Sequence, residues 1–315
     1  MQMRLIGKSG ISVSPLCLGG NVFGWTADES ASFAVLDAFV DGGLNFIDTA
    51  DVYSRWVPGH TGGESETVIG KWLKRSGART KVVIATKVGM EMGPDSKGLA
   101  KEYILRAVED SLRRLQTDYI DLYQSHTDDA ATPLEETLEA FSQLVRQGKV
   151  KAIGASNYTG ERLENALSVS EQHKLARYEC LQPHYNLCER SGYESTLEPV
   201  CSANGIAVIP YFSLASGFLT GKYHSEADLA KGPRGAMVKK YLNDRGLAIL
   251  KSLDQVAKDH HSTPAAVSLA WLMARPSITA PIASATSVEQ VRDLAAATQL
   301  TLDKASIEAL NQASA

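Results

Sequence analysis

The sequence predicts an α/β fold, a (β/α)8 TIM barrel with an N-terminal β-hairpin and one or two extra helices. Short apolar runs alternate with helical patterns along the 315 residues, and this alternation is typical of parallel strands joined by helices. No linker divides the chain, so residues 1–315 are expected to form a single barrel domain. The rival fold, a doubly wound open sheet, usually carries G-x-G-x-x-G after its first strand, whereas Gly19, Gly20 and Gly24 have a different spacing.

Each element follows from its periodicity and from the residues that bound it. Residues 4–13 alternate loosely around Gly10, as in a small hairpin. Apolar runs predict strands at residues 16–18, 45–49, 82–86, 119–124, 152–154, 180–182, 206–210 and 278–282. Apolar residues at helical spacing predict helices at residues 30–40, 64–75, 101–115, 132–148, 161–173 and 194–203. After a long connection at residues 212–240, a helix at residues 243–260 breaks the alternation.

Capping residues mark three helix starts. Thr132-Pro133-Leu134-Glu135 combines an N-cap threonine, a first-turn proline and a capping-box glutamate. Thr263-Pro264 begins a further helix, and Ser287 with Gln290 three residues later predicts the start of the last barrel helix.

Composition excludes several classes of function. A net charge of −4 and a pI near 6.0 give no reason to expect nucleic acid or an anionic membrane as partner. No run approaches the roughly 18 apolar residues of a membrane helix, and no leader is recognisable, so a cytoplasmic protein is expected. The cysteines lack C-x-x-C pairing and zinc-type spacing to histidine, so buried thiols and no metal are expected at Cys17, Cys180, Cys188 and Cys201.

Polar side chains follow three consecutive predicted strands. The second strand ends in Asp48 with Tyr53 just beyond it, the third ends in Lys87, and the fourth leads to His126. Any one of these residues alone is more often structural, but in a barrel the carboxyl ends of adjacent strands meet at one rim. We therefore expect the four side chains to converge there.

The chemistry of such a cluster follows from its groups. A tyrosine with an ordinary pKa of about 10 is a poor proton donor near neutrality, and an adjacent ammonium such as Lys87 lowers that pKa. Asp48 can pair with Lys87, and His126 can orient a carbonyl or offer a second route for a proton. No nucleophile, metal or second catalytic carboxylate accompanies them. A proton donor without such a partner indicates reduction of a carbonyl by hydride from a cofactor.

The sequence resembles the aldo-keto reductase superfamily over essentially its whole length. Its general character is that of the bacterial, short-tailed branch near the potassium-channel β-subunit relatives and the general stress reductases. The motifs that carry the resemblance are Gly19-Gly20, Asn45-Phe46-Ile47-Asp48-Thr49-Ala50-Asp51-Val52-Tyr53, Thr86-Lys87, Tyr123-Gln124-Ser125-His126, Gly154-Ala155-Ser156-Asn157, Gln182-Pro183-His184-Tyr185-Asn186 and Gly217 to Tyr223.

The resemblance implies catalytic roles. Tyr53 would be the general acid/base, Lys87 and Asp48 would tune it, and His126 would orient the substrate carbonyl. It also implies a cofactor extended across the barrel mouth, held by Ser156, Asn157 and Gln182 at the carboxamide, Tyr211 on the nicotinamide ring, Ser213, Leu214 and Lys222 near the pyrophosphate, and Ser284, Thr286 and Gln290 near the adenosine phosphate. Lys222 could equally be a surface charge.

Two departures from the family pattern bear on cofactor and substrate. Residues 282–287 lack the basic residue that commonly contacts the 2′-phosphate of NADPH, so NADP(H) is expected but NAD(H) remains possible. The chain ends at Ala315 without the long tail of other branches, so a steroid-type pocket is not expected. Trp56, in the long loop after Tyr53, is a candidate for the substrate pocket or for a packing role within that loop.

The expected function is therefore NAD(P)H-dependent reduction of aldehydes or ketones, or the reverse oxidation, with a small-molecule carbonyl or alcohol as substrate. The alternative is a nicotinamide-binding regulatory subunit of the channel β-subunit type, although no partner-binding segment precedes the predicted barrel. A third interpretation, a barrel hydrolase or isomerase without nicotinamide, requires the four-residue match to be accidental. A monomer or a small homo-oligomer is expected.

Overall fold

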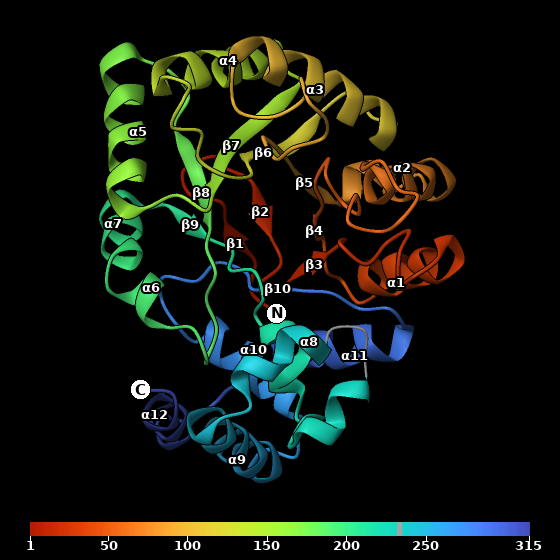
Figure 1. Cartoon of the computed structure of the whole chain (residues 1–315), viewed down its shortest axis with the longest axis vertical. Helices are drawn as coiled ribbons and strands as arrows, with labels where there is room; N and C mark the ends of the chain where they lie inside the picture. Colours follow the sequence, from red (N-terminus) through yellow and green to blue (C-terminus); the bar gives the residue numbers. More distant parts are fainter. Residues whose placement is uncertain (232–234) are drawn as a thin grey trace.

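A curled sheet of eight parallel strands forms the centre of the protein in this computed structural model, which describes residues 1–231 and 235–315 (Figure 1). The strand order is β10-β3-β4-β5-β6-β7-β8-β9. Across the two edges, Ile282 N donates to Pro210 O at 2.9 Å and Thr279 N donates to Val208 O at 2.8 Å. The arrangement fits a (β/α)8 fold. The strands are β3 (Cys17–Gly19), β4 (Phe46–Asp48), β5 (Val83–Val88), β6 (Ile120–Ser125), β7 (Val150–Ser156), β8 (Tyr178–Gln182), β9 (Ala207–Val208) and β10 (Ile282–Ala283).

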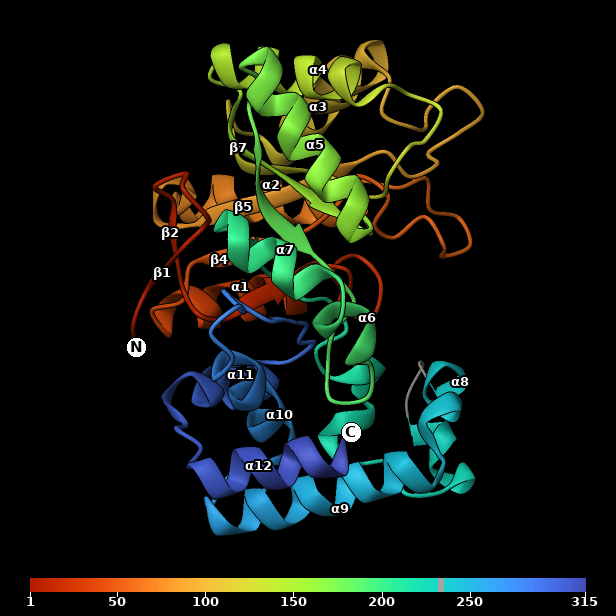
Figure 2. The same cartoon turned by 90° about the vertical axis from the view of Figure 1, so that its left-hand side faces the viewer.

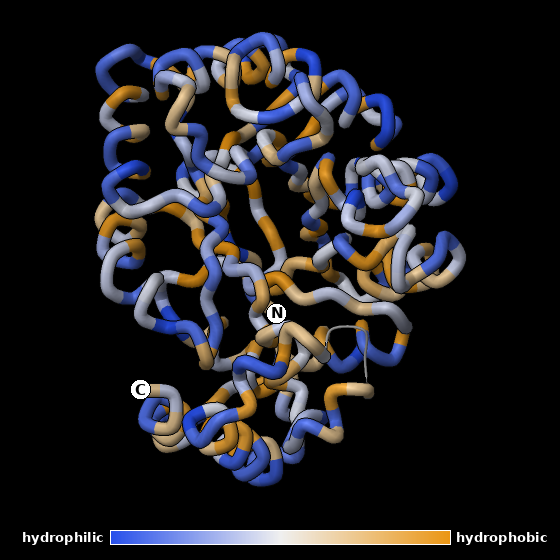
Figure 3. The backbone as a smooth tube through the Cα atoms, viewed as in Figure 1, coloured by the Kyte–Doolittle hydropathy of each residue, from blue (hydrophilic) through white to orange (hydrophobic). Residues whose placement is uncertain are grey.

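Helices surround this sheet, and further helices lie outside the strand-helix alternation. The surrounding helices are α1 (Glu29–Asp41), α2 (Glu64–Ser76), α3 (Lys101–Leu115), α4 (Leu134–Arg146), α5 (Gly160–His173), α6 (Ser191–Glu194), α7 (Leu197–Asn204), α10 (Pro264–Met273) and α11 (Val288–Ala296). The extra helices α9 (Asp244–Asp259) and α12 (Lys304–Ala313) pack side by side at one end of the molecule (Figure 2). In Figure 3 the peripheral helices alternate between hydrophilic and hydrophobic residues, as burial of one helix face requires.

Neighbouring residues of a strand point to opposite faces of the sheet. Apolar side chains therefore form two clusters, one on each face. One cluster fills the inside of the sheet and includes Cys17, Phe46 and Leu122. The other lies between the strands and the helices. The hairpin of β1 (Arg4–Leu5) and β2 (Ser12–Val13) contributes Val13 to the inner cluster. Figure 2 shows this hairpin on the side opposite to the long loops that follow β4, β5 and β6.

Most predicted elements are present, and the predicted helix at residues 243–260 is confirmed as α9. Thr263 and Ser287 accept hydrogen bonds from Ala266 N and Gln290 N, so both predicted N-caps are confirmed. The predicted connection at residues 212–240 contains short helical turns at Ala215–Thr220 and Glu226–Lys231 and the helix α8 (Gly235–Val238). Residues 232–234 of that connection lie outside the described residues.

Several predicted boundaries differ from those of the structure, and three of the differences have a local reason. Thr132 does not cap α4, because its hydroxyl donates to Asp129 Oδ2 and Pro133 occupies the N-cap position. The predicted helix at residues 194–203 is divided into α6 and α7.

That division lies where Ser195 and Thr196 turn their hydroxyls to carbonyls four residues back, an interaction that weakens helix continuity. The last strand is shorter and later than residues 278–282, because Pro281 has no N–H to donate within a ladder. The strand predicted at residues 206–210 is likewise shorter, since β9 covers only Ala207–Val208.

No helix among residues 1–231 and 235–315 is long and apolar enough to cross a membrane. The four cysteines are buried free thiols, as their spacing predicted.

Candidate active site

The four strand-end residues meet at one rim of the sheet. In the strand register, Asp48 lies opposite Ala85, and Lys87 lies opposite Gln124. Asp48 is the last residue of β4, Lys87 lies near the end of β5, and His126 directly follows β6. Tyr53 lies in the turn after β4, within hydrogen-bond reach of Lys87. The structure therefore brings together side chains that are up to 78 positions apart in the chain.

Lys87 is the centre of this group, and its side chain is fully buried. Its Nζ donates to Asp48 Oδ2 at 2.6 Å, to the Thr49 carbonyl at 2.7 Å and to Tyr53 OH at 3.1 Å. An ammonium group has three protons to donate, so all three are used. The third bond makes the Tyr53 oxygen an acceptor, which leaves the phenol proton available for another partner.

Two amides that are distant in sequence bind the other oxygen of Asp48. Gln182 Nε2 donates to Asp48 Oδ1 at 2.9 Å, and Gln124 Nε2 lies 3.3 Å from the same atom. We expected Gln182 beside the cofactor, whereas its amide nitrogen here contacts Asp48. The role of Gln124 was missed; its position as the residue aligned with Lys87 on the next strand could have indicated it.

The ionisation of these groups follows from burial and from their neighbours. Burial alone lowers the pKa of Lys87, but Asp48 and Tyr53 outweigh this effect, and its pKa is raised, so the ammonium form is favoured. For Tyr53, burial is the largest effect and raises the pKa, while Lys87 opposes it. Lys87 therefore lowers the pKa of Tyr53, as the sequence led us to expect. Burial outweighs this effect, and the net pKa shift of Tyr53 is upward.

His126 is a neutral imidazole beside the tyrosine. Burial, and secondarily the charge of Lys87, holds the pKa of His126 well below its usual range. Its ring centre lies 5.8 Å from that of Tyr53 in an edge-to-face arrangement. Its Nδ1 is buried without a hydrogen-bond partner in the described part of the chain. A neutral ring of this kind can donate one N–H to a carbonyl oxygen without adding charge.

Three of the predicted cofactor residues form a network with His126. Asn157 Nδ2 donates to the His126 carbonyl at 2.9 Å, and Tyr211 OH donates to Asn157 Oδ1 at 2.8 Å. Ser156, at the end of β7, donates to the Gln182 carbonyl at 2.8 Å. The Tyr211 ring is stacked on His184, with centroids 5.2 Å apart. We call Asp48, Tyr53, Lys87 and His126 the Tyr53 group. Through these bonds it has Ser156, Asn157 and Tyr211 next to it.

The remaining cofactor candidates lie in two segments. Ser213 donates its hydroxyl to the Pro210 carbonyl, and Leu214 packs against the outer apolar cluster. Lys222 Nζ lies 5.1 Å from the ring centre of Tyr223. These contacts do not by themselves bring Ser213, Leu214 and Lys222 to the Tyr53 group.

The segment before α11 approaches the end of β3. Ser284 donates to Asn21 Oδ1 at 2.6 Å, and Asn21 was missed by our sequence reasoning although it follows the Gly19-Gly20 pair. A Cβ at Gly19 would lie 2.6 Å from Ser284 Oγ, so a larger residue there would displace the Ser284 side chain. Thr286 donates through its N–H and hydroxyl to Gln290 Oε1, at 2.9 and 3.3 Å.

Trp56 extends a row of aromatic rings at the same rim. Its ring centre lies 5.7 Å from Tyr53 and 5.7 Å from Trp25, edge to face in both pairs. The residue is 49% exposed. Trp25, from the connection between β3 and α1, was not recognised in the sequence.

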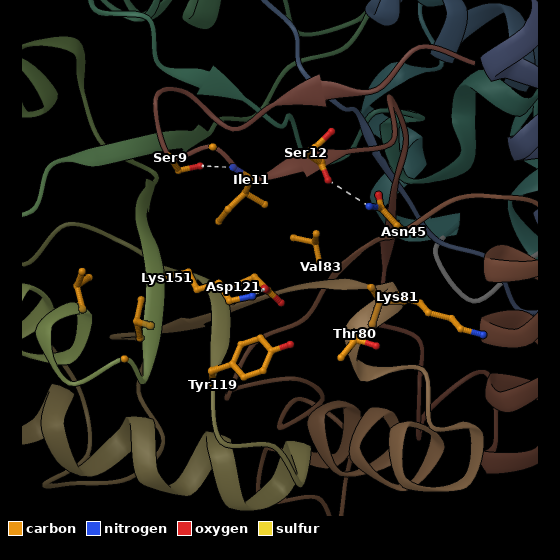
Figure 4. A pocket seen from close by; sticks show the side chains of 15 residues that line it. Ser9, Ile11, Ser12, Asn45, Thr80, Lys81, Val83, Tyr119, Asp121 and Lys151 are labelled. Atoms are coloured by element: carbon orange, nitrogen blue, oxygen red, sulfur yellow. Dashed lines mark hydrogen bonds and ion pairs between the residues drawn. The ribbon is translucent and has the colours of Figure 1, made fainter.

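A cavity of about 680 Å³ lies at the other end of the sheet, next to the hairpin. Figure 4 shows hairpin residues on one side of it and Tyr119, Asp121 and Lys151 on the other. The carboxylate in its lining is already paired, because Asp121 accepts from Lys151 Nζ and from the Arg79 guanidinium, both at 2.8 Å. Reactive groups in such folds collect at the carboxyl ends of the strands, so the Tyr53 group is the candidate site.

The sequence model of the aldo/keto reductase family matches residues 15–315. The chain belongs to this family. Its relatives include the uncharacterized oxidoreductase YrpG of Bacillus subtilis, which is 38% identical over 99% of this chain and 95% of that protein. A probable voltage-gated potassium channel subunit beta of Oryza sativa is 32% identical over 92% and 89% of the two chains. L-glyceraldehyde 3-phosphate reductase of Escherichia coli is 31% identical over 93% and 86%. Membership of the aldo/keto reductases supports oxidoreductase activity on small-molecule carbonyls with a nicotinamide cofactor.

Proposed function

We propose that this aldo/keto reductase is an NADP-preferring reductase of aldehydes and ketones that also runs the reverse oxidation of alcohols. One observation carries the proposal: Lys87 Nζ donates to the Tyr53 oxygen at 3.1 Å while Asp48 binds the same ammonium at 2.6 Å. The phenol oxygen is an acceptor in this bond, so its proton can be donated to a carbonyl oxygen. This supports Tyr53 as general acid in reduction and, as phenolate, general base in oxidation.

The roles of the other residues follow from their charges. In reduction the carbonyl π bond breaks, the carbon takes a hydride and the oxygen takes the Tyr53 proton. A nicotinamide cofactor supplies the hydride when bound. Lys87 stabilises the phenolate that remains, and Asp48 balances the buried charge of Lys87. His126 donates an N–H that holds the carbonyl oxygen near Tyr53.

The residues proposed to bind the cofactor match its chemistry. The amides of Asn157 and Gln182 and the hydroxyl of Ser156 suit a carboxamide, which both donates and accepts hydrogen bonds. The flat Tyr211 ring beside them suits stacking on a nicotinamide. We assign Ser213, Leu214 and Lys222 to the pyrophosphate and Ser284, Thr286 and Gln290 to the adenosine phosphate. The helix α11 begins at this segment, and its N-terminal N–H groups favour an anion such as a 2′-phosphate.

The decisive experiment is Tyr53→Phe, which removes the proton donor and keeps the ring. We expect kcat for an aldehyde to fall by about 100-fold or more, while the affinity for NADPH, followed by quenching of tryptophan fluorescence, stays near the wild-type value. Tyr119→Phe, at the opposite end of the sheet, is the matched control and should leave both quantities unchanged. Turnover by Tyr53→Phe at nearly the wild-type rate would disprove the role of Tyr53. The same titration with NADH tests the cofactor preference: binding of NADH as tight as that of NADPH would contradict it.

A second function is supported by the names of three relatives. The rice protein similar to this chain is named a probable potassium channel subunit beta, and such a regulatory subunit would bind nicotinamide yet act through a partner. The name of the E. coli relative, L-glyceraldehyde 3-phosphate reductase, instead supports carbonyl reduction. Tight NADPH binding without turnover of any aldehyde or ketone, together with a co-purifying membrane protein, would favour the regulatory function.

A further inference from the structure

The row of rings that ends at Trp56 bears on which carbonyl compounds the site accepts. Trp25, Trp56, Tyr53 and His126 follow one another with ring centres 5.7 to 5.8 Å apart, each pair edge to face. The row therefore includes the exposed Trp56 and ends at the proposed proton donor and carbonyl-orienting imidazole. Consider a substrate whose carbonyl oxygen lies at Tyr53 and whose remaining atoms point along this row. Those atoms must pass the exposed part of Trp56.

The loop that carries Trp56 is held at both ends. The Glu64 carboxylate accepts from Ser54 N at 3.2 Å, from Thr61 N at 2.8 Å and from Gly62 N at 3.1 Å. Ser54 Oγ also lies 2.9 Å from His60 Nδ1 within the same loop. Trp56 is thus presented by a fixed segment, and a fixed aromatic side chain costs little ordering entropy when a ligand packs on it.

The basic residues of the same loop already have partners. Arg55 Nη1 donates to the Glu91 carbonyl at 2.9 Å, and His60 Nδ1 lies 2.9 Å from Ser54 Oγ. The half-buried Met92, which follows β5, lies against Gly62 of the loop and adds a polarisable apolar group. The groups around Trp56 are therefore suited to apolar contact.

We propose that this enzyme selects carbonyl compounds with a flat, apolar body, such as aromatic or conjugated aldehydes and ketones, and that Trp56 is the residue that determines this specificity. The inference rests on the proposed function, because it concerns the substrate of the Tyr53 site. Trp56 is 49% exposed, and a planar substrate gains more contact on its indole than a short aliphatic or phosphorylated one.

The test compares kcat/KM for cinnamaldehyde, propanal and glyceraldehyde 3-phosphate with NADPH. The wild-type enzyme should prefer cinnamaldehyde. In Trp56→Ala we expect kcat/KM for cinnamaldehyde to fall about 10-fold or more, in line with the loss of one aromatic contact, and that for propanal to change less than about 2-fold. Trp56→Phe should recover most of the preference. Leu247→Ala, which truncates another exposed apolar side chain on α9, should change neither value.

The outcomes separate the inference from the function on which it rests. Equal losses for cinnamaldehyde and propanal in Trp56→Ala would overturn the inference, since Trp56 would then only support Tyr53. A wild-type preference for propanal or glyceraldehyde 3-phosphate would overturn it as well. Absence of turnover for all three compounds, with NADPH bound tightly, would instead overturn the proposed reductase function. Binding of NADPH measured by calorimetry should be the same in wild type and Trp56→Ala.

Discussion

At the scale of single residues, the site depends on a buried ammonium. Lys87 is fully buried and Asp48 is only 2% exposed, so neither charge is stabilised by water. Desolvation of such a pair is costly, and the pair is retained here with its hydrogen-bonding capacity filled by Thr49, Tyr53, Gln124 and Gln182. The ammonium therefore acts on the neighbouring phenol at short range and in a medium where its charge is weakly screened.

Replacement of Lys87 by Met should alter the pH profile as well as the rate. The charge of Lys87 lowers the pKa of Tyr53, so its removal should raise that pKa further. Alcohol oxidation needs the phenolate, and its activity in Lys87→Met should therefore appear only at higher pH than in wild type, with kcat at neutral pH reduced about 100-fold or more. The pH dependence of kcat for oxidation measures this shift.

The variant leaves Asp48 as a buried charge without its cation, which threatens folding. The double variant Lys87→Met/Asp48→Asn removes both charges and should show the same shift with less loss of stability. Lys81→Met, at the exposed opposite end of the sheet, is the control. A pH profile in the double variant that coincides with the wild-type profile would disprove the electrostatic role of Lys87.

At the scale of elements, the loop from Ser54 to Gly63 is organised by the first residue of α2. Glu64 binds three backbone N–H groups, one before the loop's bend and two after it. Burial by itself raises the pKa of Glu64, but these N–H donors outweigh it, so its pKa lies below the ordinary value of 4.5. A carboxylate whose pKa is lower in the folded loop than in the unfolded chain stabilises the loop at pH values above its unfolded pKa. This stabilisation is lost as the pH falls through its folded pKa. The loop should therefore be fixed at neutral pH and loosen only in acid.

Glu64→Gln tests this contribution. The amide of glutamine keeps one acceptor oxygen but turns N–H groups toward backbone donors, so we expect the loop to lose about 1–3 kcal/mol of local stability. Hydrogen exchange of the Ser54, Thr61 and Gly62 amides should accelerate roughly 10-fold or more. Glu102→Gln, an exposed carboxylate in the first turn of α3, should leave these amides unchanged. Unaltered exchange in Glu64→Gln would show that the loop is held by other contacts.

At the scale of the whole molecule, the layers are joined by a buried polar group between the sheet and two helices. Glu66 of α2 accepts from Thr86 of β5 and from Arg114 of α3, both at 2.6 Å. The helices approach closely because Gly70 of α2 has no side chain: a Cβ there would lie 2.1 Å from the Arg114 carbonyl. Near them, Asp51 is 2% exposed, and neither of its carboxylate oxygens has a hydrogen-bond partner in the described residues.

This carboxyl group should make the stability of the fold depend on pH. Burial, and then the charge of Glu66, raises the pKa of Asp51 from 3.8 to about 8. The folded protein therefore keeps a proton that the unfolded chain releases near pH 4, and the free energy of unfolding should fall as pH rises from about 4 to about 8, by at most about 1.4 kcal/mol per pH unit from this group.

Asp51→Asn cannot titrate, so it should lack this part of the decline. Urea unfolding between pH 4 and pH 9 measures the free energy of unfolding in both proteins, and Asp118→Asn, which changes an exposed carboxylate, is the control. Parallel curves for wild type and Asp51→Asn would show that Asp51 titrates near its ordinary pKa in the fold.

The sequence by itself determined the strand and helix alternation, the N-caps at Thr263 and Ser287, and the residues at the ends of three consecutive strands. These features are local: periodicity and caps depend on residues within a few positions of one another. Strand ends indicate a shared rim only because a parallel sheet aligns them, which made Asp48, Tyr53, Lys87 and His126 recognisable before their distances were known.

Tertiary structure alone decided how those residues are surrounded. Gln182 lies 134 positions from the Asp48 that it contacts, Ser284 lies 263 positions from Asn21, and no local pattern links either pair. Burial also reversed the expected direction of the Tyr53 pKa shift, because desolvation depends on every atom that surrounds the phenol and only partly on Lys87. The pairing of Trp25 with Trp56 has the same origin: two loops from different strand-helix units meet only once the sheet has curled.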